Sequence, residues 1–454
     1  MASAADSMAS GLNLSKFGQA TELKKRLWFT LGALIIFRML SFVPLPGVDP
    51  TQLGLLADRT QGGVLDFFNT FSGGALERMS VIALGVMPYI TASIVVQLAT
   101  SLSPTLAAIK KDGESGRKRL NQYTRYGTVA LTAIQGYFIA VGLETLGATQ
   151  GLAPVVEPGM LFRVAAVISL IGGTMFLMWL GEQITSRGVG NGISLIIMAG
   201  IVAHLPTTLV QLFEGGRSGS MNPVTLVAIL AAVAGLVLFI CFMERAQRRI
   251  LIQYPKRQTQ RGVQSERSHL PLKINTAGVI PPIFASSLLL MPLTVSQFAG
   301  QAQSGESWGG DLIITLNQYL QHGSLVYMLL YGAGIIFFSF FYTAVVFNPE
   351  ETAENLKKYG GFIPGIRPGK NTEAYFDYVL TRITVIGAAY LTVICLLPEY
   401  LVSALAIPFY LGGTSLLIVV NVTMDTVTQI QSHLLAHQYG DLIKKAKLKG
   451  GRLR

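Results

Sequence analysis

Long apolar runs separated by short charged segments make up most of the chain. Each run is long enough to cross a hydrocarbon core of ~30 Å as a helix. Run length, gaps between charges and Gly/Pro punctuation together predict an all-α integral membrane protein with about ten spans. These spans are expected near 25–44, 78–102, 124–144, 160–181, 191–213, 223–244, 275–297, 325–347, 378–397 and 403–430.

The composition agrees with a membrane protein. The 454 residues are 51% hydrophobic and only 13% charged, whereas soluble domains carry about a quarter charged residues. Cys241 and Cys395 each lie inside an apolar run without metal or redox spacing, so we expect no disulfide framework, metal or other cofactor. The run 27–43 precedes no small-residue cleavage site, which predicts a retained first span.

Lysine and arginine gather in alternate connecting segments. With the amino terminus inside, the outer segments hold only Arg59, Arg78, Arg163 and Arg217. Basic residues near span ends stay on the cytoplasmic side, so both termini are expected there. The domains predicted are an amino-terminal segment 1–24, five-helix halves 25–213 and 214–430 in inverted orientation around a central pore, and a basic tail 431–454.

A glycine-bracketed segment, 62–74, precedes the second span. It covers about three helical turns, too short to cross a bilayer. Its apolar residues recur at helical spacing, so one face favours burial within protein. A helix lying flat on the outer leaflet is the other interpretation.

The long inner loops 103–123, 244–274 and 348–377 carry many charges. The second places five arginines around Tyr254, a composition suited to RNA phosphates or an acidic protein surface. Fixing the topology is the alternative role for such charges. The five arginines are Arg248, Arg249, Arg257, Arg261 and Arg267.

The third inner loop contains GIRPGK at 365–370, which superficially resembles a nucleotide phosphate loop. Pro364 stands where that motif needs glycine, and Asn371 stands where it needs serine or threonine. We therefore reject nucleotide hydrolysis and expect a bent loop that presents Arg367 to a partner.

The central parts of the spans carry almost no ionisable residues, which ion-coupled carriers usually need. Branched aliphatic residues instead stand beside glycine and proline at 85–90, 192–197, 281–283 and 412–418. Such side chains can close a narrow pore by excluding water, or they can simply pack against helices and lipid. Gln97 and Asn275 can hydrogen-bond across a helix seam.

Several motifs together resemble the SecY family, the pore-forming subunits of the bacterial protein-secretion channel. They extend nearly from end to end and are GGAL (73–76), ALGVMPYI (83–90), ESGR (114–117), QYTRYG (122–127), WLGEQI (179–184), GNGIS (190–194), HLPLK (269–273), FNP (347–349), GIRPG (365–369) and PFYLGGTSLLI (408–418).

The resemblance implies a passive gated channel that moves unfolded secretory chains across the membrane and releases transmembrane segments sideways into it. It implies a lateral gate with Gln97 and Asn275 and a motor or ribosome contact at Arg248, Arg249, Arg257, Arg261 and Arg367. It implies a pore ring of Val86, Ile90, Ile193, Ile197, Ile283 and Ile418. It implies a plug, 62–74, that includes Gly63, Val64, Leu65, Phe68, Asn69, Phe71, Gly73 and Gly74.

The resemblance further implies smaller SecE and SecG subunits, the SecA motor or the ribosome with its RNA, and signal sequences as partners. It places the chain in the bacterial cytoplasmic membrane, in contact with lipid. Val86 and the double proline at 281–282 depart from the family's usual pattern. An ion-coupled small-solute transporter is the alternative function. A membrane enzyme is weaker still, because no paired carboxylates or nucleophile–base set appears in the spans.

Overall fold

The computed structural model describes residues 21–53, 69, 72–150, 154–218, 222–254, 257–259, 262–264, 267–289, 324–405 and 412–450. The chain forms two compact units. Unit 1 comprises 1–207, 297–310 and 422–454, and unit 2 comprises 208–296 and 311–421. The predicted boundary between the halves, 213/214, stays a prediction.

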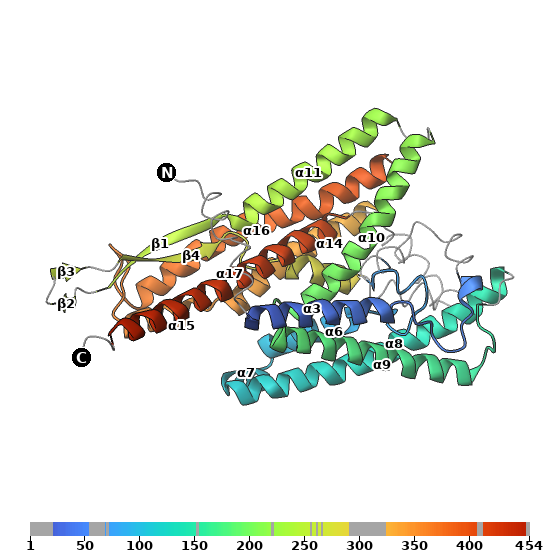
Figure 1. The fold of residues 1–454 in the computed structure, drawn as a ribbon, viewed down its shortest axis with the longest axis horizontal. Helices are drawn as coiled ribbons and strands as arrows, with labels where there is room; N and C mark the ends of the chain where they lie inside the picture. The colour runs from blue at the N-terminus through green and yellow to red at the C-terminus, as the bar shows by residue number, and fades with distance from the viewer. Residues whose placement is uncertain are drawn as a thin grey trace. The chain divides into compact units, whose positions relative to one another are not determined.

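Unit 1 is helical. Its elements are α3 (Thr21–Leu40), α6 (Met87–Leu102), α7 (Pro104–Lys111), α8 (Glu114–Gln150), α9 (Met160–Arg187), the first part of α10 (Gly192–Arg217) and the last part of α17 (Gly413–Gly450). The long helices α8 and α9 run side by side as a hairpin (Figure 1).

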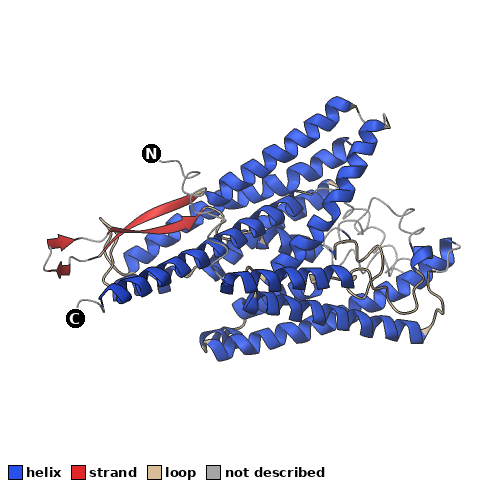
Figure 2. Cartoon of the chain, viewed as in Figure 1, coloured by secondary structure: helices blue, strands red, loops and turns tan. Residues whose placement is uncertain are grey.

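Unit 2 contains helices and a strand hairpin. Its helices are the end of α10, α11 (Pro223–Arg245), the short helix Ile280–Leu289, α14 (Leu325–Val346), α15 (Pro349–Lys358), α16 (Lys370–Leu405) and the start of α17. The strands β1 (Gln247–Gln253) and β4 (Arg267–Lys273) pair antiparallel, and β2 (Arg257–Thr259) pairs with β3 (Gly262–Gln264) between them (Figure 2).

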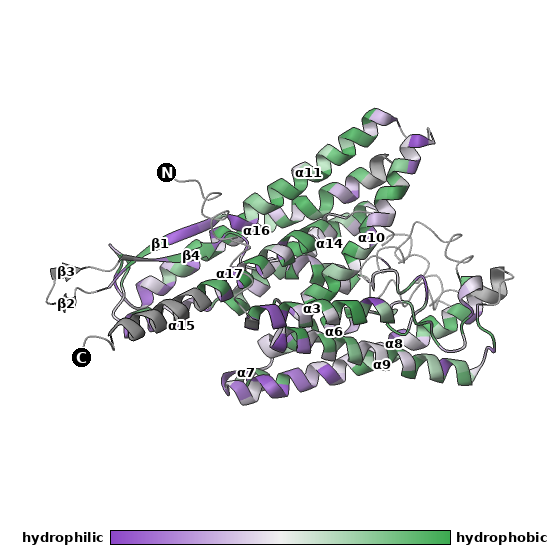
Figure 3. Ribbon diagram, viewed as in Figure 1, coloured by the Kyte–Doolittle hydropathy of each residue, from purple (hydrophilic) through white to green (hydrophobic). Residues whose placement is uncertain are grey.

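Six helices among the described residues are long and apolar enough to cross a membrane, or seven if α6 and α7, bent by 101°, count as one span. Figure 3 shows α11 as hydrophobic along most of its length. Only 11% of the apolar window of α11 is buried within the protein. Its outward aliphatic and aromatic side chains, such as Leu238 and Phe242, therefore suit contact with lipid.

The second predicted span starts later than expected. The prediction of a helix from residue 78 is wrong, because α6 begins at Met87. The preceding backbone is held by other partners: Leu45 N donates to Met79 O at 2.8 Å, and Val81 N donates to Val43 O at 3.0 Å. Met79 and Gly85 also have positive φ, which interrupts a right-handed helix.

The strand hairpin in the second inner loop was not predicted from the sequence. Ile250 and Ile252 of β1 are buried, whereas Leu251 and Gln253 beside them are partly exposed, as expected for a strand with one covered face. Ile250 belongs to an apolar core with α15 and α16. Gln253 and Phe362 exchange two backbone hydrogen bonds at 2.9 and 3.0 Å, which joins the second inner loop to the third.

Candidate functional site

Two of the predicted pore residues stand at the start of α6. Val86 precedes the helix and Ile90 follows one turn later, and their exposed fractions are 4% and 6%. Pro88 occupies the first turn, where its missing N–H costs no hydrogen bond. The break in the backbone at Gly85 therefore sets where α6 begins and where both side chains lie.

Two more predicted pore residues lie one turn apart on α10. Ile197 is 4% exposed and Ile193 is half-buried. A Cβ atom on Gly192 would collide with the carbonyl oxygen of Gly181 in α9, so the backbones of the two helices approach closely. The Thr185 hydroxyl accepts a hydrogen bond from Gly192 N at 2.8 Å. These contacts fix the beginning of α10.

The remaining two predicted pore residues belong to unit 2. Ile283 is 7% exposed on the short helix Ile280–Leu289, and Ile418 is fully buried on α17. A Cβ atom at Gly413 would collide with the carbonyl oxygen of Ile394, so α17 starts tightly against α16. Five of the six predicted pore residues are thus buried, and the sixth is half-buried.

The structure describes the carboxyl end of the predicted plug. Arg38 Nη1 donates to the carbonyl oxygen of Gly73 at 2.6 Å. Gly73 and Gly74 have φ of 70° and 81°, a turn that favours glycine. A Cβ atom on Gly73 would lie 3.0 Å from the Cα of Gly200 in α10. Gly63, Val64, Leu65, Phe68 and Phe71 lie outside the described residues.

Asn69 is tied to the segment that follows the plug. Its Nδ2 donates to Glu77 Oε2 at 2.8 Å, and its Oδ1 accepts from Glu77 N at 3.0 Å. The backbone of Asn69 also hydrogen-bonds His204 of α10. Glu77 and His204 were not predicted as partners of Asn69. They follow it by eight and 135 positions, and hydrophobic periodicity does not connect residues at those distances.

An aromatic ring near the same segment lies between two arginines. The Cζ atoms of Arg38 and Arg78 lie 4.9 and 4.2 Å from the centroid of the Phe42 ring. Such cation–π contacts stabilise the guanidinium groups where water is scarce. Arg38 thereby contacts both the Gly73 turn and the end of its own helix.

The two predicted lateral-gate residues have different surroundings. Asn275 is 5% exposed, and its Nδ2 donates to Glu244 Oε1 at 2.6 Å and to the carbonyl oxygen of Gly278 at 3.1 Å. Asn275 therefore links the end of α11 to the segment before the short helix. Gln97 is half-buried and donates to Ser93 of its own helix at 3.3 Å.

The predicted motor and ribosome contacts are partly described. Arg248 and Arg249 are exposed on β1, and Arg367 is exposed in the turn before α16. The carbonyl oxygen of Arg367 accepts from the Thr372 hydroxyl at 3.0 Å, which anchors that turn to the helix. The backbone of Arg257 lies in β2, and Arg261 lies outside the described residues.

The polar lower part of the last span contacts the turn between α9 and α10. Gln429 Oε1 accepts from Gly190 N at 2.9 Å, and a Cβ atom on Gly190 would lie 3.2 Å from Thr426 Oγ1. On the other side of this turn, Val189 N donates to the Thr30 hydroxyl at 3.1 Å. These contacts of Thr426 and Gln429 were not predicted from the sequence, because their partner Gly190 lies in a turn that is distant along the chain.

The described residues hold no group of three His, Cys, Asp or Glu side chains suited to a metal. Both cysteines are free, with Cys395 buried. The described residues instead form three features. Buried aliphatic side chains lie at closely packed helix starts, a glycine turn at 73–74 is held by hydrogen bonds, and exposed arginines lie on a strand hairpin.

Comparison with known proteins agrees along most of the chain. The SecY family model matches residues 80–427. The protein translocase subunit SecY of Escherichia coli K12 is 53% identical over 434 residues, 95% of this chain and 96% of that one. The subunit of the same name from Rickettsia bellii is 50% identical over 438 residues, covering 96% and 99%.

Solved structures share the fold. One described as a protein conducting channel matches with a TM-score of 0.65 at 16% identity, covering 90% of this chain and 92% of that one. Sec61 in the canine ribosome–channel complex from the endoplasmic reticulum matches with a TM-score of 0.62, 16% identity and the same coverage.

The helices, their apolar surfaces and these matches define a multi-pass membrane protein with the fold of protein-conducting channels. The chain belongs to the SecY family. Its relatives are subunits of the protein translocase, and the chain is accordingly a channel subunit of that translocase. Such a channel subunit is not by itself a catalytic enzyme. The predicted fold class of about ten spans is confirmed by this match.

Proposed function

We propose that this chain is a passive, gated conduit for unfolded secretory polypeptides and for transmembrane segments that leave it sideways. It works in a bacterial cytoplasmic membrane with both termini on the cytoplasmic side. SecE and SecG complete the channel, and SecA or a ribosome supplies the driving force from the inner side.

One observation carries the proposal: the six aliphatic side chains predicted to close the pore are turned into the protein. Val86, Ile90, Ile197, Ile283 and Ile418 are buried, and Ile193 is half-buried, whereas lipid-facing positions such as Leu238 are 71% exposed. Branched apolar groups inside a narrow constriction keep it dry and block ions until a chain enters.

The plug and the lateral gate give this conduit two movable parts. The turn at Gly73 is held by one hydrogen bond from Arg38 and by close approach to α10, so the segment before it has a defined hinge. Asn275 joins α11 to the start of the seventh span through Glu244. A signal sequence that enters between spans two and seven competes with such polar contacts.

The inner basic surface suits an external motor or ribosome. Arg248 and Arg249 are exposed at the start of β1, and the next residue of this strand, Ile250, lies in an apolar core with α15 and α16. The same core includes Ile363 and borders Ile366, beside Arg367. Exposed arginines on a well-packed loop can bind phosphate or carboxylate groups of a partner. The apolar core beneath them keeps the loop folded while the partner exerts force.

Reconstitution tests the function. Proteoliposomes with this chain, SecE and SecA should protect a secretory precursor from added protease when ATP is supplied. A precursor without its signal sequence should stay accessible and serves as the control. Uptake of small solutes driven by a proton or sodium gradient, without precursor transport, would contradict the proposal and favour an ion-coupled carrier.

A further inference from the structure

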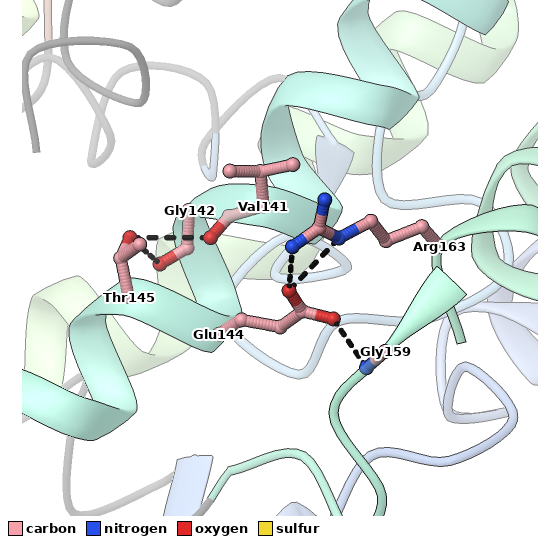
Figure 4. Close-up of polar contacts among 6 residues, drawn as sticks. All are labelled: Val141, Gly142, Glu144, Thr145, Gly159 and Arg163. Atoms are coloured by element: carbon pink, nitrogen blue, oxygen red, sulfur yellow. Dashed lines mark hydrogen bonds and ion pairs between the residues drawn. The ribbon is translucent and has the colours of Figure 1, made fainter. Parts of the chain in front are cut away.

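A half-buried ion pair closes the end of the α8–α9 hairpin that the charge pattern assigns to the outside. Glu144 Oε2 accepts from Arg163 Nε at 2.9 Å and from Nη2 at 2.7 Å, and its Oε1 accepts from Gly159 N at 3.0 Å (Figure 4). The Glu144 side chain is 9% exposed. Three donors on one carboxylate fix both helices and the loop between them.

The loop held by this pair forms a short backbone ladder with the segment after α3. Asp49 N donates to Pro154 O at 2.9 Å, and Val156 N donates to Gly47 O at 3.0 Å. Val48 and Val155 form the bridge between them and are both buried. The position of the loop therefore sets the position of residues 47–49.

The same segment continues the ladder towards the pore. Residues 43–45 hydrogen-bond to 79–81 at 2.8 and 3.0 Å, with Pro44 and Ser80 as the bridge. Helix α9 packs behind both ladders, since a Cβ atom on Gly47 would lie 3.0 Å from Phe162 and one on Gly173 would collide with the carbonyl oxygen of Val81.

The last segment of this ladder, residues 79–81, lies between the glycine turn at 73–74 and the start of α6. It follows that turn by five residues and precedes Val86 by another five. The residues on both sides, 72–76 and 82–86, are buried. A shift of residues 79–81 would therefore move the glycine turn and the start of α6 together.

We propose that Glu144 and Arg163 are positioning residues that keep the resting channel closed by holding the plug hinge through this ladder. The inference rests on the proposed channel function. Neither residue contacts the turn at 73–74 directly. Their effect passes through hydrogen-bonded backbone, which transmits displacement better than a flexible loop does.

A second ion pair between the same helices provides the matched control. At the opposite end of the hairpin, Arg125 Nη2 donates to Glu182 Oε1 at 2.8 Å and to Oε2 at 2.7 Å. This pair also joins α8 to α9 but holds no part of the loop 154–159. Weakening it tests whether looser α8–α9 packing alone disturbs the channel.

The experiment compares Glu144→Gln and Glu182→Gln in the full channel with its partner subunits. Resting ion conductance is measured in planar bilayers. Labelling of Ser72→Cys by a membrane-impermeant maleimide is measured from the outer side, with background set by the parent chain and its own two cysteines. Losing one charge-assisted hydrogen bond shifts a closed–open equilibrium about tenfold, so E144Q should raise both readouts by about that factor, while E182Q should leave them unchanged.

Two results would overturn the inference while leaving the channel function intact. The first is parent-like conductance and labelling for E144Q in a channel that translocates precursor normally. The second is an equal rise for E144Q and E182Q, which would assign the effect to general helix packing. If E144Q does not accumulate, Arg163→Lys is compared with E182Q in its place. This substitution keeps the positive charge but loses the paired hydrogen bonds of the planar guanidinium group. A parent chain that moves no precursor would instead contradict the proposed function.

Discussion

At the scale of single residues, the proposed seal consists of apolar side chains that exclude water. Ile90→Ser and Ile283→Ser each place a hydroxyl where a buried branched side chain stands. A polar group in a narrow apolar constriction favours entry of water, so we expect a higher resting ion leak from each variant in planar bilayers.

Val95→Ser is the matched control for Ile90→Ser, because Val95 lies on the same helix and is 55% exposed. Its conductance should equal that of the parent. Unchanged conductance in both isoleucine variants would reject their assignment to the pore.

Residue types along the sequence could be used to predict which positions are apolar. They could not be used to predict the hydrogen-bond partners of the polar side chains. Branched side chains beside glycine and proline form a recognisable pattern, but only the resemblance to the SecY family singled out Ile90 and Ile418 as pore residues. The bond from Arg38 to Gly73 and the contact of Gln429 with Gly190 join residues 35 and 239 positions apart. Such partners follow from tertiary packing, which local periodicity does not encode.

At the scale of elements, close helix packing places the start of α10. In Gly192→Ala, the new Cβ atom would collide with the carbonyl oxygen of Gly181, which cannot yield as a flexible side chain would. Overpacking of this kind costs about 1–3 kcal/mol and displaces Ile193. We expect a lower apparent melting temperature in detergent and a higher resting leak.

Gly172→Ala in α9 is the control, because a Cβ atom added there would meet no other atom within 4 Å. Alanine favours helix over glycine by about 1 kcal/mol, so this variant should be as stable as the parent or slightly more. Equal destabilisation by both substitutions would show that close approach at Gly192 is not the cause.

The exposed arginines of β1 should bind a phosphate-rich partner. Reversing Arg248 and Arg249 to glutamate replaces two exposed cations at the start of β1 by anions, so ribosome binding should weaken more at low salt than at high salt. The slope of log affinity against log salt should become shallower by about one for each phosphate that an arginine no longer neutralises.

Arg367→Glu should chiefly impair SecA-driven transport. Normal translocation by this variant and by the variant with Arg248 and Arg249 reversed would show that these residues serve only as topology markers.

The existence of the spans was predictable, and their detailed starts were not. Hydropathy identifies α8, α9 and α11 because about twenty apolar residues in a row have few other uses. It could not place the start of α6, since the backbone at 79–81 pairs with 43–45 instead of continuing a helix. It also missed β1, because Ile250, Leu251 and Ile252 form a continuous apolar run without the alternation that marks a half-buried strand.

At the scale of the whole molecule, the chain passes between its two units more than once. Helix α10 begins in unit 1 and ends in unit 2, and α17 begins in unit 2 and continues into unit 1 from Val422. The sequence predicted two consecutive halves because spans are counted in chain order. The return of the last helix to unit 1 depends on its contacts with the turn at 188–190, which counting does not capture.

The orientation of the whole chain follows from its lysine and arginine distribution and can be tested with two cysteine variants. Val156→Cys lies in the α8–α9 loop and Tyr359→Cys follows α15, and the native side chains are 69% and 78% exposed. Basic residues near span ends favour the cytoplasmic side, so the proposed orientation places Tyr359 inside and Val156 outside. In intact spheroplasts, a membrane-impermeant maleimide should therefore label V156C at once and Y359C only after the membrane is permeabilised. The parent chain sets the background, and the reverse order of labelling would contradict the orientation, since each site has comparable exposure and differs only in the side of the membrane on which it lies.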